Sequence, residues 1–257
     1  LSSGTWTLSV TAADWAGNVS AKAAAFTVIS DALPPRTTLA IGLPQFSSAT
    51  VYVTAQTSFT LTPIDDALVV GDSNGVGVAF QALSVDGLAR STFTNTAPAV
   101  GQSFSSSFTL VTDSDGVHFL SFYALDVLGN REAVRVATVA VDNTPPISSL
   151  VIGQPQFALS TSTLLVSSKT LFAFSSVDPV SSNVASGVKQ TFFQVNGSTL
   201  AVFTSSFTLS PPDGPKVIEF FSRDNVLNAE IARSSSVLLD ATPPEVALLS
   251  PAACDSG

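Results

Sequence analysis

The sequence predicts an all-β protein built from tandem β-sandwich modules. Three observations support this fold class. Apolar residues make up 45% of the chain, but they occur in short runs that Ser, Thr, Gly and Pro interrupt. No stretch keeps the 3.6-residue apolar period of an amphipathic helix, whereas several runs alternate with a period of two. The same motifs also recur along the chain, which is typical of a repeat architecture.

Two recurring motifs define the modules. An Asp followed by a Pro-Pro pair occurs at 31–35, 142–146 and 240–244, and a loop with Asp first and Asn last precedes each pair, at 14–18, 126–130 and 224–228. We therefore interpret residues 31–141 and 142–239 as two complete modules. Residues 1–30 match the last strands of a preceding module, and residues 240–257 match the first strand of a following one.

The first fragment is expected to leave apolar side chains uncovered. Trp6, Leu8, Val10 and Phe26 alternate with polar residues there, yet residues 1–30 contain only enough chain for a hairpin. An isolated hairpin is marginal in water. Either the chain is an excerpt of a longer protein, which we favour, or a neighbouring subunit completes the missing strands by β-strand addition.

Within the modules, strands and turns follow from the pattern of side chains. Dense apolar runs at 5–14, 117–126 and 216–224 predict strands, and 59–64 predicts the second strand of the first module. We expect the core-facing residues of these runs to be Leu8, Val10, Ala12, Leu120, Phe122, Ala124, Ile218, Phe220 and Ser222. Asp-Gly and Asn-Gly pairs at 86–87, 115–116, 196–197 and 213–214 predict hairpin turns. About seven short strands per module predict an immunoglobulin-like sandwich.

These motifs together resemble the tandem bacterial immunoglobulin-like repeats of large cell-surface and secreted adhesin and fibre proteins. The resemblance covers nearly the whole chain and is carried by the Asp-x-x-Gly-Asn loop, the Asp-x-Thr-Pro-Pro junction, the Asp-Gly pairs and Ser186-Gly187-Val188. Two positions depart from it, because Leu227 stands where Gly is expected and Leu33 stands where Thr is expected. The resemblance implies an elongated rod, stalk or filament outside the cell, often with calcium at the junctions between modules.

The acidic residues can be placed on the predicted sandwich. The segment before the first strand, the B–C loop and the F–G loop lie at one pole of such a fold, which gathers Asp31, Asp65 and Asp126 in the first module. The corresponding residues of the second module are Asp142, Asp178 and Asp224. Three carboxylates in loops repel one another unless a cation joins them, and hard cations prefer several oxygen ligands. We therefore predict calcium at both clusters, with the second cluster the better of the two.

A structural role for the same residues is the alternative. An Asp before a turn commonly caps its own backbone, and Asp-x-x-Gly-Asn is also the pattern of a tight F–G hairpin whose Gly supplies a positive φ. In the calcium interpretation, Asn130 or Asn228 would contribute a carbonyl oxygen or only fix the loop. Both interpretations remain open from the sequence.

The remaining residues exclude several classes of function. One His, one Cys and no Met leave no intrachain disulfide and no Cys/His zinc site. Ten basic residues and a net charge of −9 argue against nucleic-acid binding, and no apolar run reaches the roughly 18 residues of a membrane helix. His118 aligns with Trp6 and Lys216, so we expect packing near the E–F turn and no enzyme activity. Trp15 is expected to pack in its loop, and Cys254 is either free or paired outside the chain.

The sequence thus favours a structural or adhesive segment of a long extracellular repeat protein. The Pro-Pro pairs fix φ and favour stiff, extended connections between modules. The partners of this segment would be neighbouring modules of the same chain or copies of itself in a fibre. A surface glycan or a host or partner-cell protein would be a further class of partner. The alternative is a non-catalytic spacer or carbohydrate-binding module of a large secreted enzyme, which a flanking catalytic module would identify.

Overall fold

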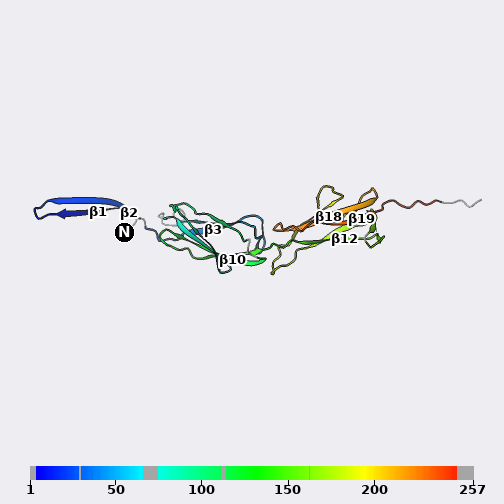
Figure 1. Cartoon of the computed structure of the whole chain (residues 1–257), viewed down its shortest axis with the longest axis horizontal. Helices are drawn as coiled ribbons and strands as arrows, with labels where there is room; N and C mark the ends of the chain where they lie inside the picture. The colour runs from blue at the N-terminus through cyan, green and yellow to red at the C-terminus, as the bar shows by residue number, and fades with distance from the viewer. Residues whose placement is uncertain (1–3, 29, 66–74, 111–113, 162, 248–257) are drawn as a thin grey trace, which may run out of the picture. The chain divides into compact units, whose positions relative to one another are not determined.

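The computed structural model describes residues 4–28, 30–65, 75–110, 114–161 and 163–247 and is all-β in those ranges (Figure 1). It divides into two compact units. The first comprises Leu1–Asn143 with Ser181–Val184, and the second comprises Thr144–Val180 with Ala185–Gly257. Each unit contains one two-sheet sandwich, and the first also includes an N-terminal hairpin.

The first sandwich has a three-stranded and a six-stranded sheet. Its strands are β3 (Arg36–Ile41), β4 (Gln45–Ser47), β5 (Val51–Val53), β6 (Phe59–Ile64), β7 (Val78–Val85), β8 (Leu88–Thr94), β9 (Ser106–Phe108), β10 (Gly116–Asp126) and β11 (Arg135–Val141). One sheet has the order β3-β6-β9 and the other β4-β5-β11-β10-β7-β8. In immunoglobulin terms these sheets are A-B-E and A′-G-F-C-C′. The first strand is divided, because β3 pairs with β6 whereas β5 pairs in parallel with β11 in the opposite sheet.

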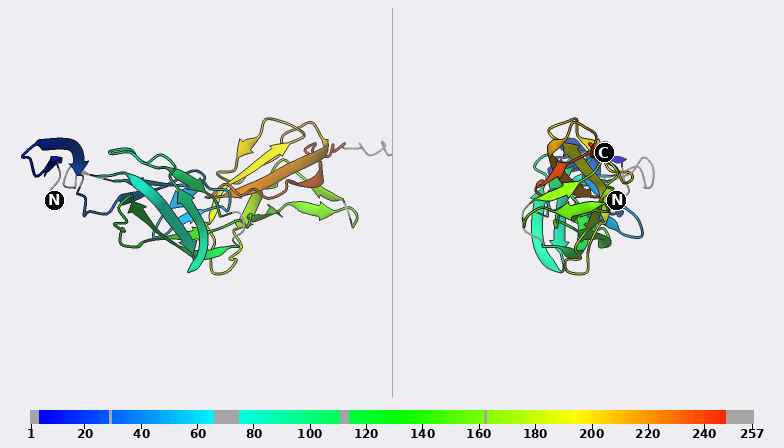
Figure 2. Two further views of the ribbon diagram at one scale, coloured as in Figure 1. Left: turned by 60° about the vertical axis from the view of Figure 1, so that its left-hand side comes forward. Right: turned by 90° about the vertical axis from the view of Figure 1, so that its right-hand side faces the viewer.

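The second sandwich repeats this plan. Its strands are β12 (Ile147–Ile152), β13 (Gln156–Ala158), β14 (Leu164–Val166), β15 (Phe172–Val177), β16 (Val188–Val195), β17 (Ala201–Val202), β18 (Gly214–Asp224) and β19 (Arg233–Leu239). The sheets have the orders β12-β15 and β13-β14-β19-β18-β16-β17. Figure 2 shows β18, drawn in orange, as the longest strand of this unit. The predicted immunoglobulin-like sandwich is confirmed in both units.

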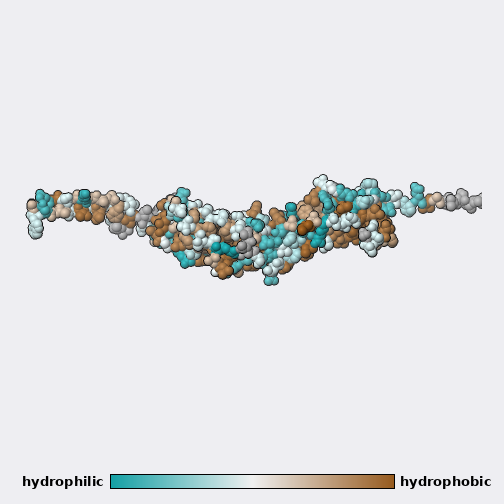
Figure 3. All heavy atoms as spheres, viewed as in Figure 1, coloured by the Kyte–Doolittle hydropathy of each residue, from teal (hydrophilic) through white to brown (hydrophobic). Residues whose placement is uncertain are grey.

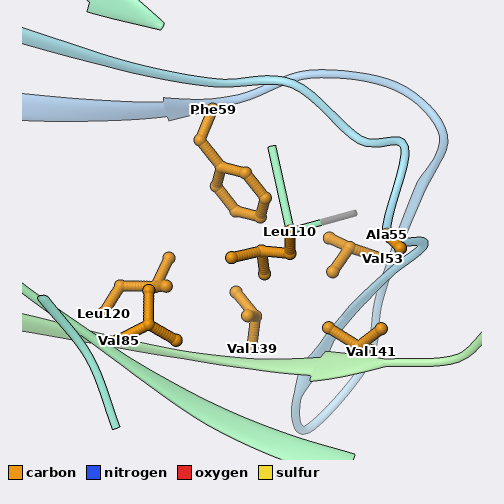
Figure 4. Packing of buried hydrophobic residues seen from close by; sticks show 8 residues of the cluster. All are labelled: Val53, Ala55, Phe59, Val85, Leu110, Leu120, Val139 and Val141. Carbon is orange, nitrogen blue, oxygen red and sulfur yellow. The ribbon is translucent and has the colours of Figure 1, made fainter. Parts of the chain in front are cut away.

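Each sandwich has its own hydrophobic core. In the first, Phe59 on β6 faces Leu120 on β10 and Val139 on β11 across the two sheets, with Leu110 between them (Figure 4). The strand β10 alternates buried and less buried residues over most of its length, so the predicted core set of Leu120, Phe122 and Ala124 is confirmed. The corresponding residues of β18 are buried too.

Aromatic rings fill the second core. Phe174 lies 5.0 Å from Phe220 and 5.1 Å from Phe203, measured between ring centroids, and Phe193 and Phe207 stack at 4.4 Å. Phe174 lies on β15 of one sheet, whereas Phe193 and Phe220 lie on β16 and β18 of the other. Offset and edge-to-face packing of this kind adds to the stabilisation from buried apolar area.

The N-terminal hairpin leaves its apolar side chains uncovered, as expected, so the prediction that Leu8, Val10 and Ala12 face a core does not hold for the described residues. Strands β1 (Gly4–Ala13) and β2 (Val19–Val28) pair along their full length, but Leu8 and Val10 are 59% and 60% exposed and face no core. Brown apolar spheres accordingly line the hairpin in Figure 3. The prediction that Trp15 packs in its loop was wrong. Trp15 lies in the tight β1–β2 turn, where no second sheet covers it, and its side chain is fully exposed.

Two of the four predicted hairpin turns were also wrong. The pairs at 86–87 and 196–197 do form turns with positive φ at both residues, as type I′ geometry requires. Val85 pairs with Leu88 across the first, and the Ser198 amide donates to the Val195 carbonyl oxygen at 3.0 Å across the second. In contrast, Gly116 and Gly214 are the first residues of the long strands β10 and β18. The Asp before each accepts a backbone N–H from the segment that follows the module, Asn143 for Asp115 and Ala241 for Asp213, both at 2.8 Å.

Candidate carboxylate clusters

The six predicted carboxylates occupy corresponding positions in the two modules. Asp65 and Asp178 directly follow β6 and β15, Asp126 and Asp224 are the last residues of β10 and β18, and Asp31 and Asp142 precede β3 and β12. The structure brings each set of three together. In each cluster, one carboxylate oxygen from each residue lies within 4.8 Å of the others. Five of the six side chains are buried, and Asp31 is partly buried.

A glycine aims its backbone amide at the B–C carboxylate of each cluster. Gly77 donates to Asp65 Oδ2 at 2.7 Å, and Gly187 donates to Asp178 Oδ2 at 2.6 Å. Both glycines have positive φ, +95° and +87°, which other residues adopt only with strain. A Cβ on Gly77 would also lie 2.7 Å from the backbone of Ala99. Each glycine precedes a valine in the sequence, as Gly77-Val78 and Gly187-Val188, and this repeated pair marks the residues that hold Asp65 and Asp178 in place.

Shared hydrogen bonds connect the first cluster. The Val76 amide lies 2.9 Å from Asp65 Oδ2 and 3.2 Å from Asp31 Oδ2, so one donor serves two carboxylates. Asn130 Nδ2 donates to Asp126 Oδ2 at 2.6 Å and to the main-chain oxygen of Asp31 at 3.1 Å. The loop before β3, the B–C loop and the F–G loop are thereby tied together at one pole of the module.

The asparagine of each F–G loop fixes the loop through its amide nitrogen. In the second module, Asp224 Oδ1 accepts the Asn228 amide at 2.8 Å, and Asp224 Oδ2 accepts Asn228 Nδ2 at 2.6 Å. Leu227 adopts a φ of +72° in this loop, where Gly129 has +89° in the first module. The substitution of Leu for Gly therefore leaves the loop conformation unchanged.

The N-terminal hairpin offers an internal comparison for these loops. Asp14 Oδ1 accepts the Asn18 amide at 2.9 Å, and Asp14 Oδ2 accepts Asn18 Nδ2 at 2.8 Å, as in the two modules. Hydrogen bonds from the side chain and backbone of Asn18 hold the pKa of Asp14 below its usual value. Because residues 4–28 supply no counterpart of Asp31 or Asp65, backbone capping alone is enough to form the loop.

Gathering the carboxylates has an electrostatic cost in the first module. Burial is the main cause that raises the pKa of Asp65, and the charges of Asp31 and Asp126 raise it further. Hydrogen bonds from Gly77 and Val76 oppose the shift but do not cancel it. The folded module therefore holds Asp65 in a place where its negative charge is disfavoured.

The donor set and its dimensions suit a calcium ion. Calcium binds oxygen ligands at about 2.3–2.6 Å, so two ligands on opposite sides of one ion are about 4.6–5.2 Å apart. The oxygens of each cluster lie within 4.8 Å of one another, so they are close enough to share one ion. A carboxylate has about four lone-pair positions, and Asp126 and Asp224 use part of them for their asparagine partners.

Two glutamates whose side chains are nearly buried, 9% exposed for Glu132 and 6% for Glu230, were missed in the sequence. Glu132 accepts the Thr37 amide at 2.9 Å and the Thr37 hydroxyl at 2.5 Å. Glu230 accepts the Ser222 amide at 2.8 Å and the Ser148 amide at 3.1 Å, and it also binds the Ser148 hydroxyl. Each joins the first strand of its module to the F–G region. The repeated Glu-x-x-Arg spacing of 132–135 and 230–233 was the available signal.

Other singled-out residues lie away from the clusters. His118 is buried on β10, with Nδ1 2.7 Å from Asp86 Oδ2 and Nε2 2.9 Å from the Ser114 carbonyl oxygen. Residues 240–247 form no strand, and the rest of the predicted strand, including Cys254, lies outside the described residues. Within the described ranges, no helix is long and apolar enough to cross a membrane.

Comparisons with known proteins gave matches among solved structures. No family model and no curated protein match the chain. Similar solved structures include fibronectin(III)-like modules of Clostridium thermocellum CbhA, with 14% identity, 83% of this chain and 100% of that chain covered, and a TM-score of 0.39. They also include the FN1–FN3 domains of chicken CNTN1, with 11% identity, 89% and 76% coverage, and a TM-score of 0.36. At these scores the fold assignment rests on the strand order of the chain itself.

A third similar structure is much larger than this chain. Dimeric latent PorU from Porphyromonas gingivalis shares 10% identity, with 93% of this chain but 30% of that chain covered and a TM-score of 0.32.

Proposed function

We propose that the chain is a structural or adhesive segment of a longer extracellular repeat protein, in which each module is locked at one pole by a calcium ion. The observation that carries this proposal is the duplicated cluster. Two modules of different sequence build the same three-carboxylate arrangement from the same three loops. A spacer needs modules whose ends resist deformation, and the cluster lies where the connecting segment joins the sandwich.

In this proposal Asp31, Asp65 and Asp126 hold one ion, and Asp142, Asp178 and Asp224 hold the other. The ion would supply positive charge that offsets the repulsion acting on Asp65 and would cross-link three loops of a module. Asp14 and its Asn18 loop stand outside either cluster and provide a natural control for the capping role alone.

Calcium titration tests the proposal directly. We expect thermal unfolding of the intact chain to shift upward from chelator to millimolar calcium, by about 2.7 kcal/mol in the unfolding free energy of each module at a hundredfold excess over Kd. The variant Asp178→Asn/Asp224→Asn, which keeps side-chain shape and hydrogen-bonding capacity, should lose the second module's share of this shift. Asp14→Asn should retain all of it. Equal thermal unfolding curves with chelator and with calcium would exclude calcium binding and leave backbone capping as the role of the clusters.

The role of the whole segment needs a separate test. Electron microscopy of the native parent protein would show a fibre or surface layer if the structural role is right. A compact enzyme carrying these modules would instead support the alternative of a non-catalytic spacer or carbohydrate-binding module. The calcium result and the imaging result are independent of one another.

A further inference from the structure

The first module has a buried histidine whose two ring nitrogens both face hydrogen-bond acceptors. His118 lies on β10, and its side chain is 11% exposed. Its Nδ1 lies 2.7 Å from the Asp86 carboxylate, and its Nε2 lies 2.9 Å from the Ser114 carbonyl oxygen. Neither a carboxylate nor a main-chain carbonyl can donate a proton to a ring nitrogen. A neutral imidazole has a single N–H and satisfies one of these contacts, whereas the imidazolium ion satisfies both.

We infer that a proton on His118 locks the first module, by tying the β7–β8 turn to the loop before β10, and that the second module lacks this lock. Neither Asp86 nor His118 belongs to the carboxylate clusters.

The lock reaches the segment through which the chain leaves the first module. Ser114 precedes Asp115, whose Oδ1 accepts the Asn143 amide at 2.8 Å. Asn143 Oδ1 in turn accepts the Ala55 amide at 2.8 Å. Loss of the Nε2 contact would release Ser114 and loosen the hold of Asp115 on Asn143. Protonation is thereby connected to the backbone at the module's end.

The charges around His118 set the pH range of the lock. Asp86 faces it from the β7–β8 turn, Arg90 on β8 acts on Asp86, and Asp115 precedes it by three residues in the sequence. Burial raises the pKa of Asp86, but hydrogen bonds from Phe119 and His118 and the charges of His118 and Arg90 outweigh it, so the pKa is lowered overall. The Asp86 carboxylate therefore stays charged to a pH below its usual range, and its contribution is lost only as the pH falls through the lowered pKa. The His118 contribution is lost as the ring deprotonates with rising pH.

The second module provides a natural comparison. Asn196 takes the place of Asp86, and its Oδ1 accepts the Val217 amide at 2.8 Å, as Asp86 Oδ1 accepts the Phe119 amide. Lys216 takes the place of His118 and is also buried. Asparagine does not titrate, and lysine ordinarily changes charge far above the histidine range. The turn is thus retained in the second module without the titrating pair.

The chain has one histidine, so a proton NMR titration reports His118 without assignment. We expect its midpoint to lie above that of the same chain unfolded in urea. After correction for intrinsic exchange rates, protection of the Phe119 and Asn143 amides should fall about tenfold as pH rises by one unit beyond the midpoint. Protection of the equivalent Val217 and Ala241 amides should stay constant. A midpoint at or below the urea value, or constant protection at Asn143, would overturn the inference.

Variants separate the lock from general stability. Asp86→Asn/His118→Lys copies the second module's pair into the first and should abolish the pH dependence at Asn143 while the module stays folded. Asn196→Asp/Lys216→His should transfer the pH dependence to Ala241. If the first double variant keeps the wild-type pH dependence, another group controls Asn143 and the inference fails.

Discussion

At the scale of single residues, the three Asp-x-x-x-Asn loops separate two roles of aspartate. Asp14, Asp126 and Asp224 make the same pair of contacts with their asparagines. Only the last two also meet two further carboxylates. Capping therefore accounts for the loop in all three places, but it does not explain why two more acidic residues converge on it in each complete module.

Asp65→Asn is expected to stabilise the calcium-free first module at neutral pH. The raised pKa of Asp65 means that the folded chain binds a proton more readily than the unfolded chain. Wild-type stability should therefore increase as pH falls through the folded pKa, and this increase is complete below the unfolded value near 3.8. The amide oxygen of Asn can still accept the Val76 and Gly77 N–H groups. Urea unfolding with chelator, from pH 4 to 7, should show higher stability and a flatter pH profile for the variant.

If calcium binds as proposed, it should reverse the order of stability in the same experiment. With calcium present, the wild-type first module should be stabilised and the Asp65→Asn module should respond weakly, because one charged ligand is gone. If Asp65→Asn is the less stable protein in chelator at pH 7, the carboxylate is a net stabilising cap and the electrostatic argument is wrong.

At the scale of secondary-structure elements, a buried glutamate joins the first strand of each module to the F–G region. Glu230 links β12, through Ser148, to β18, through Ser222. Hydroxyl groups extend this connection, since Ser222 Oγ lies 2.6 Å from Ser148 Oγ and 2.7 Å from Thr191 Oγ1. Such a network is strong when every member has its partner and costly when one is removed.

Glu230→Ala should destabilise the second module by about 2–4 kcal/mol, because it leaves the buried Ser148 and Ser222 amides without this acceptor. Glu230→Gln keeps an acceptor oxygen and should cost less. Denaturant unfolding measures both, and Glu132→Ala is the matched change in the first module. A cost for Glu230→Ala below that of an exposed substitution such as Glu245→Ala would show that water replaces the carboxylate without penalty.

The sequence predicted the elements with a strong local pattern. The bounds of β6 were predicted correctly, and β10 and β18 were placed within two residues, because dense alternation and an aligned repeat coincide there. The turns before β10 and β18 were assigned wrongly. An Asp-Gly pair has the same local preferences whether it closes a hairpin or starts a strand, and the deciding contacts, to Asn143 and Ala241, are distant in sequence.

The candidate site was predictable from topology, but its supporting contacts were not. Assigning the strands from the sequence was enough to predict that Asp31, Asp65 and Asp126 lie at one pole of the module, where the structure places them. The shared Val76 amide and the Glu132 connection depend on side-chain positions across two sheets, which no single-strand pattern encodes. Trp15 shows the same limit, since its exposure depends on the absence of a second sheet around residues 4–28.

At the scale of the whole molecule, the described chain contains separate hydrophobic cores. One is formed around Phe59, Leu120 and Val139, and another around Phe172, Ile218 and Leu239. Residues that pack in one hydrophobic core unfold cooperatively. Because each sandwich has its own core, each is expected to unfold as its own two-state unit. A spacer built from such units can lose one module under stress without losing its neighbour.

Matched core truncations test this independence. Leu120 and Ile218 occupy corresponding positions on β10 and β18, and both are fully buried. Leu120→Ala and Ile218→Ala should each cost about 2–5 kcal/mol, but each should lower only one of two calorimetric transitions. The double variant should lower both by the same amounts as the single variants, since residues without shared contacts act additively. A single transition that both substitutions shift would instead show that the sandwiches unfold as one unit, and a mechanical role would then rest on the pair of modules together.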